Sequence, residues 1–312
     1  MAFIFFVRKE WGSFIHRRKQ TATKGRNMSV KIIVDSASDI KVSYAEAKNI
    51  GFAPLKTNLA GVEYRDGIDI VPDIFYDKLA ANKELAHTSQ VNPGEFSELF
   101  EKEINEGNDV VVITISSGLS GTYQSACIAA ADCPDRVFVV DSLTATAGEQ
   151  VLIERALAMR DKGRSASEIF NELNALRTRM RLFVRVDTLE YLKRGGRISK
   201  TSAVLGGFLG IRPILTLNSE GKLETVGKPR GIPASHKMMN DSIEACSGID
   251  FSMPVVITYA GNLSDGIVQK YLDDSTHIYQ NHIDELKIGQ LGCVIGTHTG
   301  PGAIVVSFVT KE

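Results

Sequence analysis

Three short runs of apolar residues in the first half of the chain predict strands that are buried on both faces. They are "VKIIVD" (residues 30–35), "DVVVITI" (109–115) and "RVFVV" (136–140), and small polar residues follow each one. Unbroken apolar strands are typical of parallel sheets covered by helices. Stretches with helical features lie between and after these runs, at residues 93–107, 148–163 and 165–180. The alternation indicates an α/β domain with a doubly wound parallel sheet.

Start and stop signals support two of these helices. Residues 93–107 begin with Pro93 and end at Gly107, which is the usual asymmetry of a helix. Ser165 and Glu168 stand at the spacing of a capping box before the helix at 165–180.

The second half of the chain has a different pattern. Residues 212–228 ("RPILTLNSEGKLETVGK") predict a hairpin whose turn is Asn-Ser-Glu-Gly. Residues 253–261 and 293–309 predict further strands, with a helix near 264–273. We therefore predict an N-terminal α/β domain at residues 29–180 and a C-terminal α+β domain at 181–312, whose sheet is mixed or antiparallel.

Residues 1–28 fit neither domain. Six apolar residues follow Met1, with no positive segment before them and no clear cleavage site after them, so they make a poor signal peptide. We expect an extension that is disordered or arises from a misassigned start, with Met28 beginning the folded part. The alternative is a basic, aromatic arm that lies on a membrane surface.

Composition narrows the classes of function. The chain has 312 residues, 43% of them hydrophobic, and a formal net charge of -1, with no basic block beyond residue 26. Nucleic acid is therefore not an expected partner, and no apolar run is long enough for stable membrane insertion. The four cysteines form no CxxC pair and have no histidine at ligand spacing. They fit free thiols in a cytoplasmic protein, and we expect neither a metal nor a cofactor.

Three of the predicted strand ends are rich in hydroxyl groups. They are "DSASD" (35–39), "SSGLSGT" (116–122) and "DSLTATAG" (141–148). Each one alone fits helix capping. Together at the carboxyl edge of one sheet, they predict a polar pocket that suits an anion. Gly118 and Gly121 are expected to let backbone N–H groups approach the ligand.

Four further groups of polar residues have both a structural and a functional interpretation. Thr88, Ser89 and Gln90 precede the helix at Pro93, either as a capping loop or as ligand contacts. Thr297, His298 and Thr299 stand in a glycine-rich turn at a predicted strand end, either as structural residues or close to a ligand. Arg197, after Gly195-Gly196, and Arg230 are either exposed charges or forks for a carboxylate or phosphate.

The segment "SAVLGGFLGIRPIL" (202–215) is almost wholly apolar and contains three glycines. It fits a core helix or the wall of an apolar pocket, and periodicity does not separate the two.

A serine nucleophile is the main catalytic alternative. Ser117 or Ser120 would act with His298 as the base. However, Gly118-Leu119-Ser120-Gly121 is one residue short of the Gly-x-Ser-x-Gly elbow, and no acid partner is evident nearby. Motifs for nucleotide binding are absent from the sequence.

Seven segments in order resemble the DegV family of bacterial fatty-acid-binding proteins, over Lys31 to Val309. They are "KIIVDSASDI", "TSQVNPGEF", "ITISSGLSGTYQSA", "VVDSLTATAGEQ", "LEYLKRGGRIS", "RPILTLNSEGKLE" and "IGTHTGPGAI". The resemblance implies two domains with a long-chain fatty acid buried in the cleft between them, in a carrier that is not an enzyme.

The resemblance also implies roles for individual residues. Thr88, Ser89, Ser117 and His298 match the positions that hold the carboxylate, and Gly118, Ser120 and Thr297 belong to the same motifs. In better-studied members the acid is presented to a fatty-acid kinase, which makes acyl phosphate for phospholipid synthesis. Arg197 and Arg230 match arginines near the head group and the kinase-facing mouth.

This sequence departs from the family pattern at two places. Val91-Asn92 stands where Pro-Ser or Pro-Thr is usual, and residues 231–235 ("GIPAS") lack the usual basic residues. The first difference puts in question which acyl chain this protein prefers, and the second puts in question its contact with a kinase. We therefore weigh a non-catalytic carrier against a serine esterase or thioesterase, and against a regulatory module whose lipid occupancy changes a protein contact.

Overall fold

The computed structural model describes residues 29–81, 86–198, 210–262 and 266–311. The predicted extension at residues 1–28 and most of the apolar glycine-containing segment, residues 202–209, lie outside the described residues.

The first sheet is parallel and has the strand order β2-β1-β6-β7. Its strands are β1 (Val30–Asp35), β2 (Gly51–Ala53), β6 (Asp109–Thr114) and β7 (Val137–Asp141). The three apolar runs predicted as strands are confirmed to within one residue at each end. Their central residues, such as Ile32 and Val111, are fully buried, as expected for a sheet covered on both faces.

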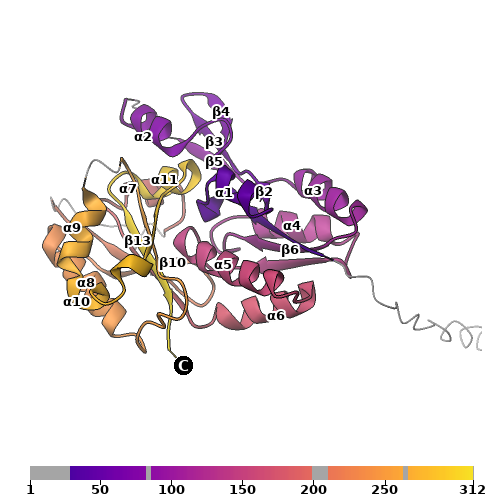
Figure 1. Cartoon of the computed structure of the whole chain (residues 1–312). Helices are drawn as coiled ribbons and strands as arrows, with labels where there is room; N and C mark the ends of the chain where they lie inside the picture. Colours follow the sequence, from indigo (N-terminus) through magenta and orange to yellow (C-terminus); the bar gives the residue numbers. More distant parts are fainter. Residues whose placement is uncertain (1–28, 82–85, 199–209, 263–265, 312) are drawn as a thin grey trace, which may run out of the picture.

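Helices cover both faces of this sheet (Figure 1). On one face lie α3 (Pro93–Asn105) and α4 (Thr122–Ala130), and on the other lie α5 (Ala147–Asp161) and α6 (Ala166–Leu176). The short α1 (Val42–Ala47) packs beside β2. The predicted capping box of Ser165 and Glu168 is confirmed at the start of α6. This helix ends before residue 180, because Met180 already belongs to a strand of the second sheet.

The second sheet is mixed, with the order β10-β9-β8-β13-β11-β12. It comprises β8 (Met180–Arg185), β9 (Ile214–Leu217), β10 (Leu223–Gly227), β11 (Val256–Tyr259), β12 (Lys287–Gln290) and β13 (Ile304–Val309). β11 and β12 run parallel, and the other neighbours are antiparallel. The predicted hairpin at 212–228 is confirmed as β9 and β10.

Helix α5 lies between the two sheets. It contacts β1 and β6 of the first sheet and also β8, β11 and β13 of the second. Val151, Leu152 and Ile153 are all buried, so this helix is apolar around most of its circumference, as a helix between two sheets must be. The other face of the second sheet carries α8 (Ile232–Glu244) and α9 (Ile267–Asp274), with the short α10 (Thr276–Tyr279) and the 3-10 turn η3 (Ile283–Glu285) nearby.

A small antiparallel sheet, with the order β4-β3-β5, was not predicted. It is formed by β3 (Lys56–Leu59), β4 (Val62–Arg65) and β5 (His87–Ser89), and α2 (Pro72–Ala81) belongs to the same region. Figure 1 shows this region projecting at the top of the molecule, above α11 (Cys293–Thr299). Two short elements complete the described fold, the 3-10 turn η1 (Ser36–Ser38) after β1 and α7 (Glu190–Arg194) after β8.

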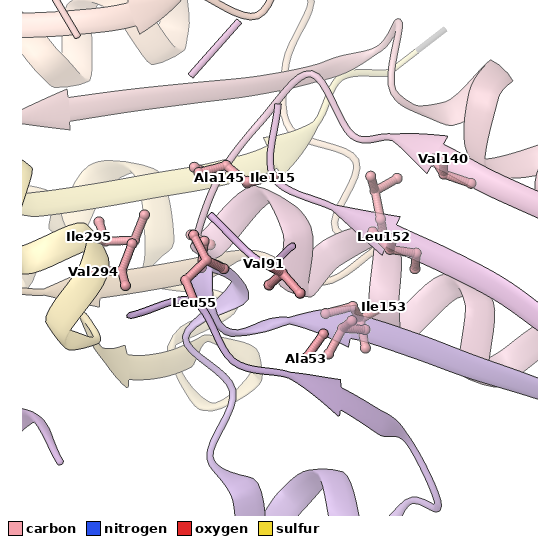
Figure 2. Close-up of a cluster of buried hydrophobic side chains, with 14 of the residues drawn as sticks. Ala53, Leu55, Val91, Ile115, Val140, Ala145, Leu152, Ile153, Val294 and Ile295 are labelled. Atoms are coloured by element: carbon pink, nitrogen blue, oxygen red, sulfur yellow. The ribbon is translucent and has the colours of Figure 1, made fainter. Parts of the chain in front are cut away.

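The prediction of strands throughout residues 293–309 is wrong in its first part. Residues 293–299 form α11, and the strand β13 begins only at Ile304. His298 therefore lies in the last turn of a helix instead of at a strand end. Val294 and Ile295 favour strands locally, but they pack with Leu55, Ile115 and Ala145 in one buried cluster (Figure 2). Tertiary packing decides the conformation of this segment.

In the described part of the chain, no helix is both long enough and apolar enough to span a bilayer.

Candidate functional site

A cavity lies where the small sheet, α11, the polar loops of the first sheet and one face of the second sheet meet. Its volume is about 70 Å³ for the space that a water-sized sphere can enter, and about 680 Å³ when all the open space between its lining residues is included. The residues that line it are Leu55, Thr88, Ile115, Leu119, Ser120, Ala145, Thr146, Leu182, Val184, Leu192, Arg197, Leu217, Leu223, Val294, Ile295, His298, Thr299 and Val305.

Most of the cavity wall is aliphatic. The second sheet contributes Leu182 and Val184 from β8, together with Leu217, Leu223 and Val305 from neighbouring strands. Five lining residues on the opposite side belong to the main hydrophobic cluster, and Figure 2 shows them together: Leu55, Ile115, Ala145, Val294 and Ile295. A wall of this kind favours a long apolar ligand, because it offers no hydrogen-bond partners.

The polar groups of the cavity are few and include a bonded pair. Thr88 Oγ1 and His298 Nε2 are 2.7 Å apart and share a hydrogen bond. Ser120 also lines the cavity, and its hydroxyl bonds to that of Thr122 at 2.9 Å. The structure thus brings together Thr88, Ser120 and His298, three predicted ligand-binding residues from distant parts of the chain.

The imidazole of His298 is neutral at physiological pH. Burial lowers its pKa to about 4, and the electrostatic interactions with Arg197 and His87 act in the same direction. Its Nδ1 is buried without a hydrogen-bond partner among the described residues. A neutral imidazole can donate from one nitrogen and accept at the other, so His298 can contact a head group without carrying a charge.

Two aspartates, of which Asp66 is fully buried and Asp39 partly so, hold the beginning of α11. Asp39 Oδ1 accepts from the amide of Gly292 at 2.9 Å, and Asp66 Oδ1 accepts from the amide of Cys293 at 3.0 Å. Burial raises the pKa of both carboxyl groups, although these bonds oppose the rise. Because both aspartates come from the first third of the chain, they tie α11, and with it His298, to the N-terminal half.

Gly195 fixes the other side of the imidazole. A Cβ atom at this position would overlap His298 Nδ1 and Cε1, so only glycine lets the turn after α7 pack against the ring. Gly195 of the predicted glycine pair therefore serves a close approach between protein segments, whereas a Cβ on Gly196 would meet no neighbouring atom.

Arg197 supplies the fixed positive charge of the cavity. Its Nε donates to Leu119 O at 3.1 Å and its Nη1 donates to Gly195 O at 2.6 Å. Burial lowers its pKa below the ordinary value, but arginine stays protonated in proteins. Since His298 is neutral, Arg197 is the lining side chain that can balance the charge of a bound carboxylate.

Five other predicted residues are not among those lining the cavity. Ser89, Ser117 and Arg230 are exposed. The Thr297 hydroxyl donates to Cys293 O at 2.8 Å within α11. Gly118 faces the second hairpin, as described next.

Gly118 and Gly121 lie against other segments of the protein, and their predicted approach to a ligand stays a prediction. A Cβ on Gly118 would lie 2.5 Å from the main-chain oxygen of Glu220. Nearby, Ser116 Oγ donates to Gly221 O at 2.9 Å. A Cβ on Gly121 would overlap the side-chain amide of Gln90. These glycines allow the loop after β6 to pack against protein segments, including the β9–β10 turn.

The three hydroxyl-rich strand ends do meet, as predicted. Ile115 N donates to Asp35 Oδ2 at 2.8 Å, Thr146 N donates to Ala37 O at 2.9 Å, and Ser116 N donates to Thr144 O at 2.8 Å. Most of their hydroxyls are consumed by such internal bonds. For example, Ser38 Oγ donates to Asp35 O, and Ser142 Oγ donates to Thr144 O.

Thr146 is a lining residue that sequence reasoning did not single out. It has φ 47° and ψ −116°, a conformation that costs a β-branched residue of order 1–3 kcal/mol. Its hydroxyl contacts that of Thr258 in β11 at 3.0 Å, which helps to hold this strained start of α5 against the second sheet. No signal in the sequence distinguishes Thr146 from the other hydroxyl residues of its segment.

The first departure from the family pattern has a structural role. Asn92 caps α3 by accepting from Glu95 N at 3.0 Å, and Glu95 Oε2 accepts from Asn92 N at 2.9 Å. Val91 is fully buried in the main hydrophobic cluster (Figure 2). At the second departure, residues 231–235 enter α8, where Pro233 stands at the first turn.

The geometry of a serine hydrolase is not formed in the described residues. His298 Nε2 is bonded to Thr88, and neither Ser117 nor Ser120 bonds to the imidazole. No carboxylate contacts His298 Nδ1. A catalytic triad requires both contacts.

Comparisons of the sequence with known proteins all find the same family. A sequence profile of the DegV family, described as uncharacterised proteins, matches residues 29–311. A DegV domain-containing protein of Caldanaerobacter subterraneus is 35% identical over 286 residues, which cover 90% of this chain and 99% of that protein.

Solved structures agree in fold over nearly the whole described chain. A DegV family protein from Thermus thermophilus, described as fatty-acid binding, superimposes with a TM-score of 0.79 at 31% identity, covering 90% of this chain and 100% of that one. A stearic-acid-binding protein from Eubacterium ventriosum gives a TM-score of 0.77 at 28% identity, covering 90% and 98%.

Proposed function

Because this chain belongs to the DegV family, we propose that it binds a long-chain fatty acid in the cavity. The observation that carries the proposal is the arrangement of the lining: an aliphatic wall with a neutral Thr88–His298 pair and the cationic Arg197. The solved relatives from Thermus thermophilus and Eubacterium ventriosum, described as binding fatty acid and stearic acid, support the same ligand class.

The acyl chain provides most of the affinity in this proposal. Burial of one methylene contributes about 0.8 kcal/mol, so roughly fifteen methylenes contribute on the order of 12 kcal/mol before the costs of association. Each net hydrogen bond to the head group adds only about 1 kcal/mol. The head-group contacts therefore set the orientation of the ligand more than its affinity.

The carboxylate is held by Thr88, Ser120, His298 and Arg197. Hydroxyl and neutral imidazole groups donate hydrogen bonds, and Arg197 supplies the counter-charge, which keeps a buried carboxylate from lying unpaired. Ser89, Ser117, Gly118 and Thr297, which the family motifs also suggest, remain predictions. Contact from Ser117 requires its loop to move, since its amide is held by Asp141 Oδ1 at 3.0 Å.

The bound acid is presented to a fatty-acid kinase, which phosphorylates the carboxylate. Arg230, exposed just before α8, is the residue proposed to face that partner. Incubation with a purified fatty-acid kinase and ATP, with hydroxylamine trapping of acyl phosphate, tests this step. Arg230→Gln should slow acyl phosphate formation and leave fatty-acid retention unchanged. No acyl phosphate from wild-type protein loaded with fatty acid would reject the kinase partner.

A serine esterase gains no support from the site, because the serine–histidine and histidine–carboxylate contacts are both missing among the described residues. Lack of labelling by a fluorophosphonate probe is the expected result.

Native mass spectrometry of protein purified without added lipid tests the binding proposal. An adduct with the mass of a long-chain fatty acid, released on denaturation, is expected. Protein that is empty and also fails to take up added palmitate or oleate would contradict the proposal.

A further inference from the structure

A second cavity, which the fatty-acid proposal does not use, lies at the junction between α6 and the second sheet. It is formed by the loop after β7, the connection from α6 into β8, and the end of β9, and we name it the arginine pocket (residues 142–144, 177–178, 180–182 and 216–219). Its volume is about 980 Å³ including the part open to solvent. Leu182 and Leu217 line both cavities, so the two are neighbours.

The charged side chains that line the arginine pocket are all positive. Arg177 and Arg181 line it, and its lining contains no aspartate or glutamate. Within the described residues neither guanidinium forms an ion pair. Arg177 donates to the main-chain oxygen of Asp141. Arg181 Nη1 donates to Thr178 O at 3.1 Å and Met180 O at 2.7 Å, and the guanidinium also contacts the Cys246 side chain. Each guanidinium has five N–H donors, so both keep donors available to a ligand.

The neutral groups of the pocket also leave donors unused. Asn218 Oδ1 accepts from Glu220 N at 3.0 Å and from Lys222 N at 3.1 Å. These two bonds fix the amide orientation and leave its NH₂ group without an acceptor among the described residues. In contrast, the hydroxyls of Ser142 and Thr216 already donate to Thr144 O and Leu182 O.

We propose that the arginine pocket binds a phosphate group, held by the guanidiniums of Arg177 and Arg181 and the amide of Asn218. Two planar forks and an amide supply many donors, and a phosphate dianion is the ligand with enough acceptor oxygens and charge to use them. The group belongs either to a soluble phosphate compound or to the head group of a lipid. The proposal rests on this pocket alone and does not depend on the fatty acid.

Two binding experiments on the full chain test the proposal. The first is calorimetric titration with inorganic phosphate in a chloride buffer. The second is sedimentation with vesicles of phosphatidic acid or of phosphatidylcholine. Saturable binding to one site is expected for inorganic phosphate, for phosphatidic acid vesicles, or for both. Binding of phosphate alone identifies a soluble ligand, and binding of phosphatidic acid but not phosphatidylcholine vesicles identifies a lipid head group.

Variants connect the binding to the pocket. Arg177→Gln with Arg181→Gln should weaken binding about tenfold or more. Arg164→Gln with Lys237→Gln changes the net charge equally at exposed ion pairs elsewhere and should leave binding unchanged. Because Arg177 also supports the main chain, Arg181→Gln alone is a second variant, expected to weaken binding several-fold. A circular dichroism spectrum and a thermal unfolding midpoint like those of the wild type show that each variant is folded. Absence of saturable binding to either probe, or equal binding by the arginine variants and the control, would overturn the proposal.

Discussion

Thr88 and His298 are 210 positions apart in the chain, and a hydrogen bond of 2.7 Å joins the Thr88 hydroxyl to the imidazole Nε2. Thr88 belongs to the small sheet of the N-terminal half, and His298 belongs to α11 near the C-terminus. The bond therefore exists only when the two halves of the chain are assembled. It places two polar groups against a cavity whose walls are otherwise mainly aliphatic.

Removal of this pair should weaken fatty-acid binding without abolishing it. Thr88→Val and His298→Ala each take away one head-group contact, which corresponds to a loss of about five- to tenfold at 1 kcal/mol or slightly more. Displacement of a fluorescent fatty acid by palmitate measures the change. His277→Ala, at an exposed histidine near Glu244, is the matched control. Wild-type affinity in the double variant would mean that the carboxylate binds elsewhere.

Arg197 should distinguish an ionised head group from a neutral one. Arg197→Gln is expected to weaken palmitate binding about tenfold or more, because it removes the charged partner of the carboxylate. Binding of hexadecanol should change little. Arg194→Gln, which removes an exposed arginine paired with Glu190, serves as control. Equal losses for the acid and the alcohol would show that Arg197 acts through packing.

The low pKa of His298 predicts an acid-sensitive contribution to stability. Its folded pKa of about 4 lies below the ordinary value of 6.5, so the unfolded chain takes up a proton between these pH values while the folded protein does not. Wild-type stability should therefore fall as the pH drops from 6.5 to 4, by about 3 kcal/mol from this group.

Denaturant unfolding of the wild type and His298→Gln checks this effect. Glutamine does not titrate, so the stability advantage of the wild type should shrink as the pH falls from 6.5 to 4. His277→Gln, at an exposed histidine, is the matched control. An advantage that stays constant or grows toward pH 4 would show that His298 is not held neutral.

Gly118 should control how closely the two halves pack. In Gly118→Ala, the new Cβ meets the main-chain oxygen of Glu220, and main chain cannot simply rotate away. We expect the free energy of unfolding to fall by about 1–3 kcal/mol and bound fatty acid to dissociate faster. Gly289→Ala is the control, because its nearest neighbour is Thr258 Cγ2 at 3.5 Å. Thermal unfolding and a stopped-flow release assay measure the two effects, and a Gly118 variant that behaves like Gly289→Ala would contradict the expectation.

The first sheet could be predicted because its strands are unbroken apolar runs, which indicate burial on both faces. A run such as Val110 to Ile113 needs covering on both faces, whatever follows it in the chain. The small sheet could not be found in this way, because β4 is exposed along most of its length and β5 has only three residues. Local patterns of this length do not separate strands from loops.

The sequence predicted which types of polar residue would stand near the site, but not which individual residues line the cavity. Ser117 and Ser120 are indistinguishable within one loop of the sequence. In the folded chain Gly118 packs on the β9–β10 turn, and Ser120 lines the cavity while Ser117 does not. The helix α11 was missed because its β-branched residues and glycines resemble a strand and turn. Its start is stabilised by Asp39 and Asp66, more than 200 positions away in the chain.

A crystal structure of the protein with stearic acid tests the central claim most directly. We predict that the acyl chain fills the cavity beside Val184 and Leu217, with the carboxylate within hydrogen-bond distance of Ser120, His298 and Arg197. Electron density that places the carboxylate away from these three side chains, or the acid outside the cavity, would contradict the account.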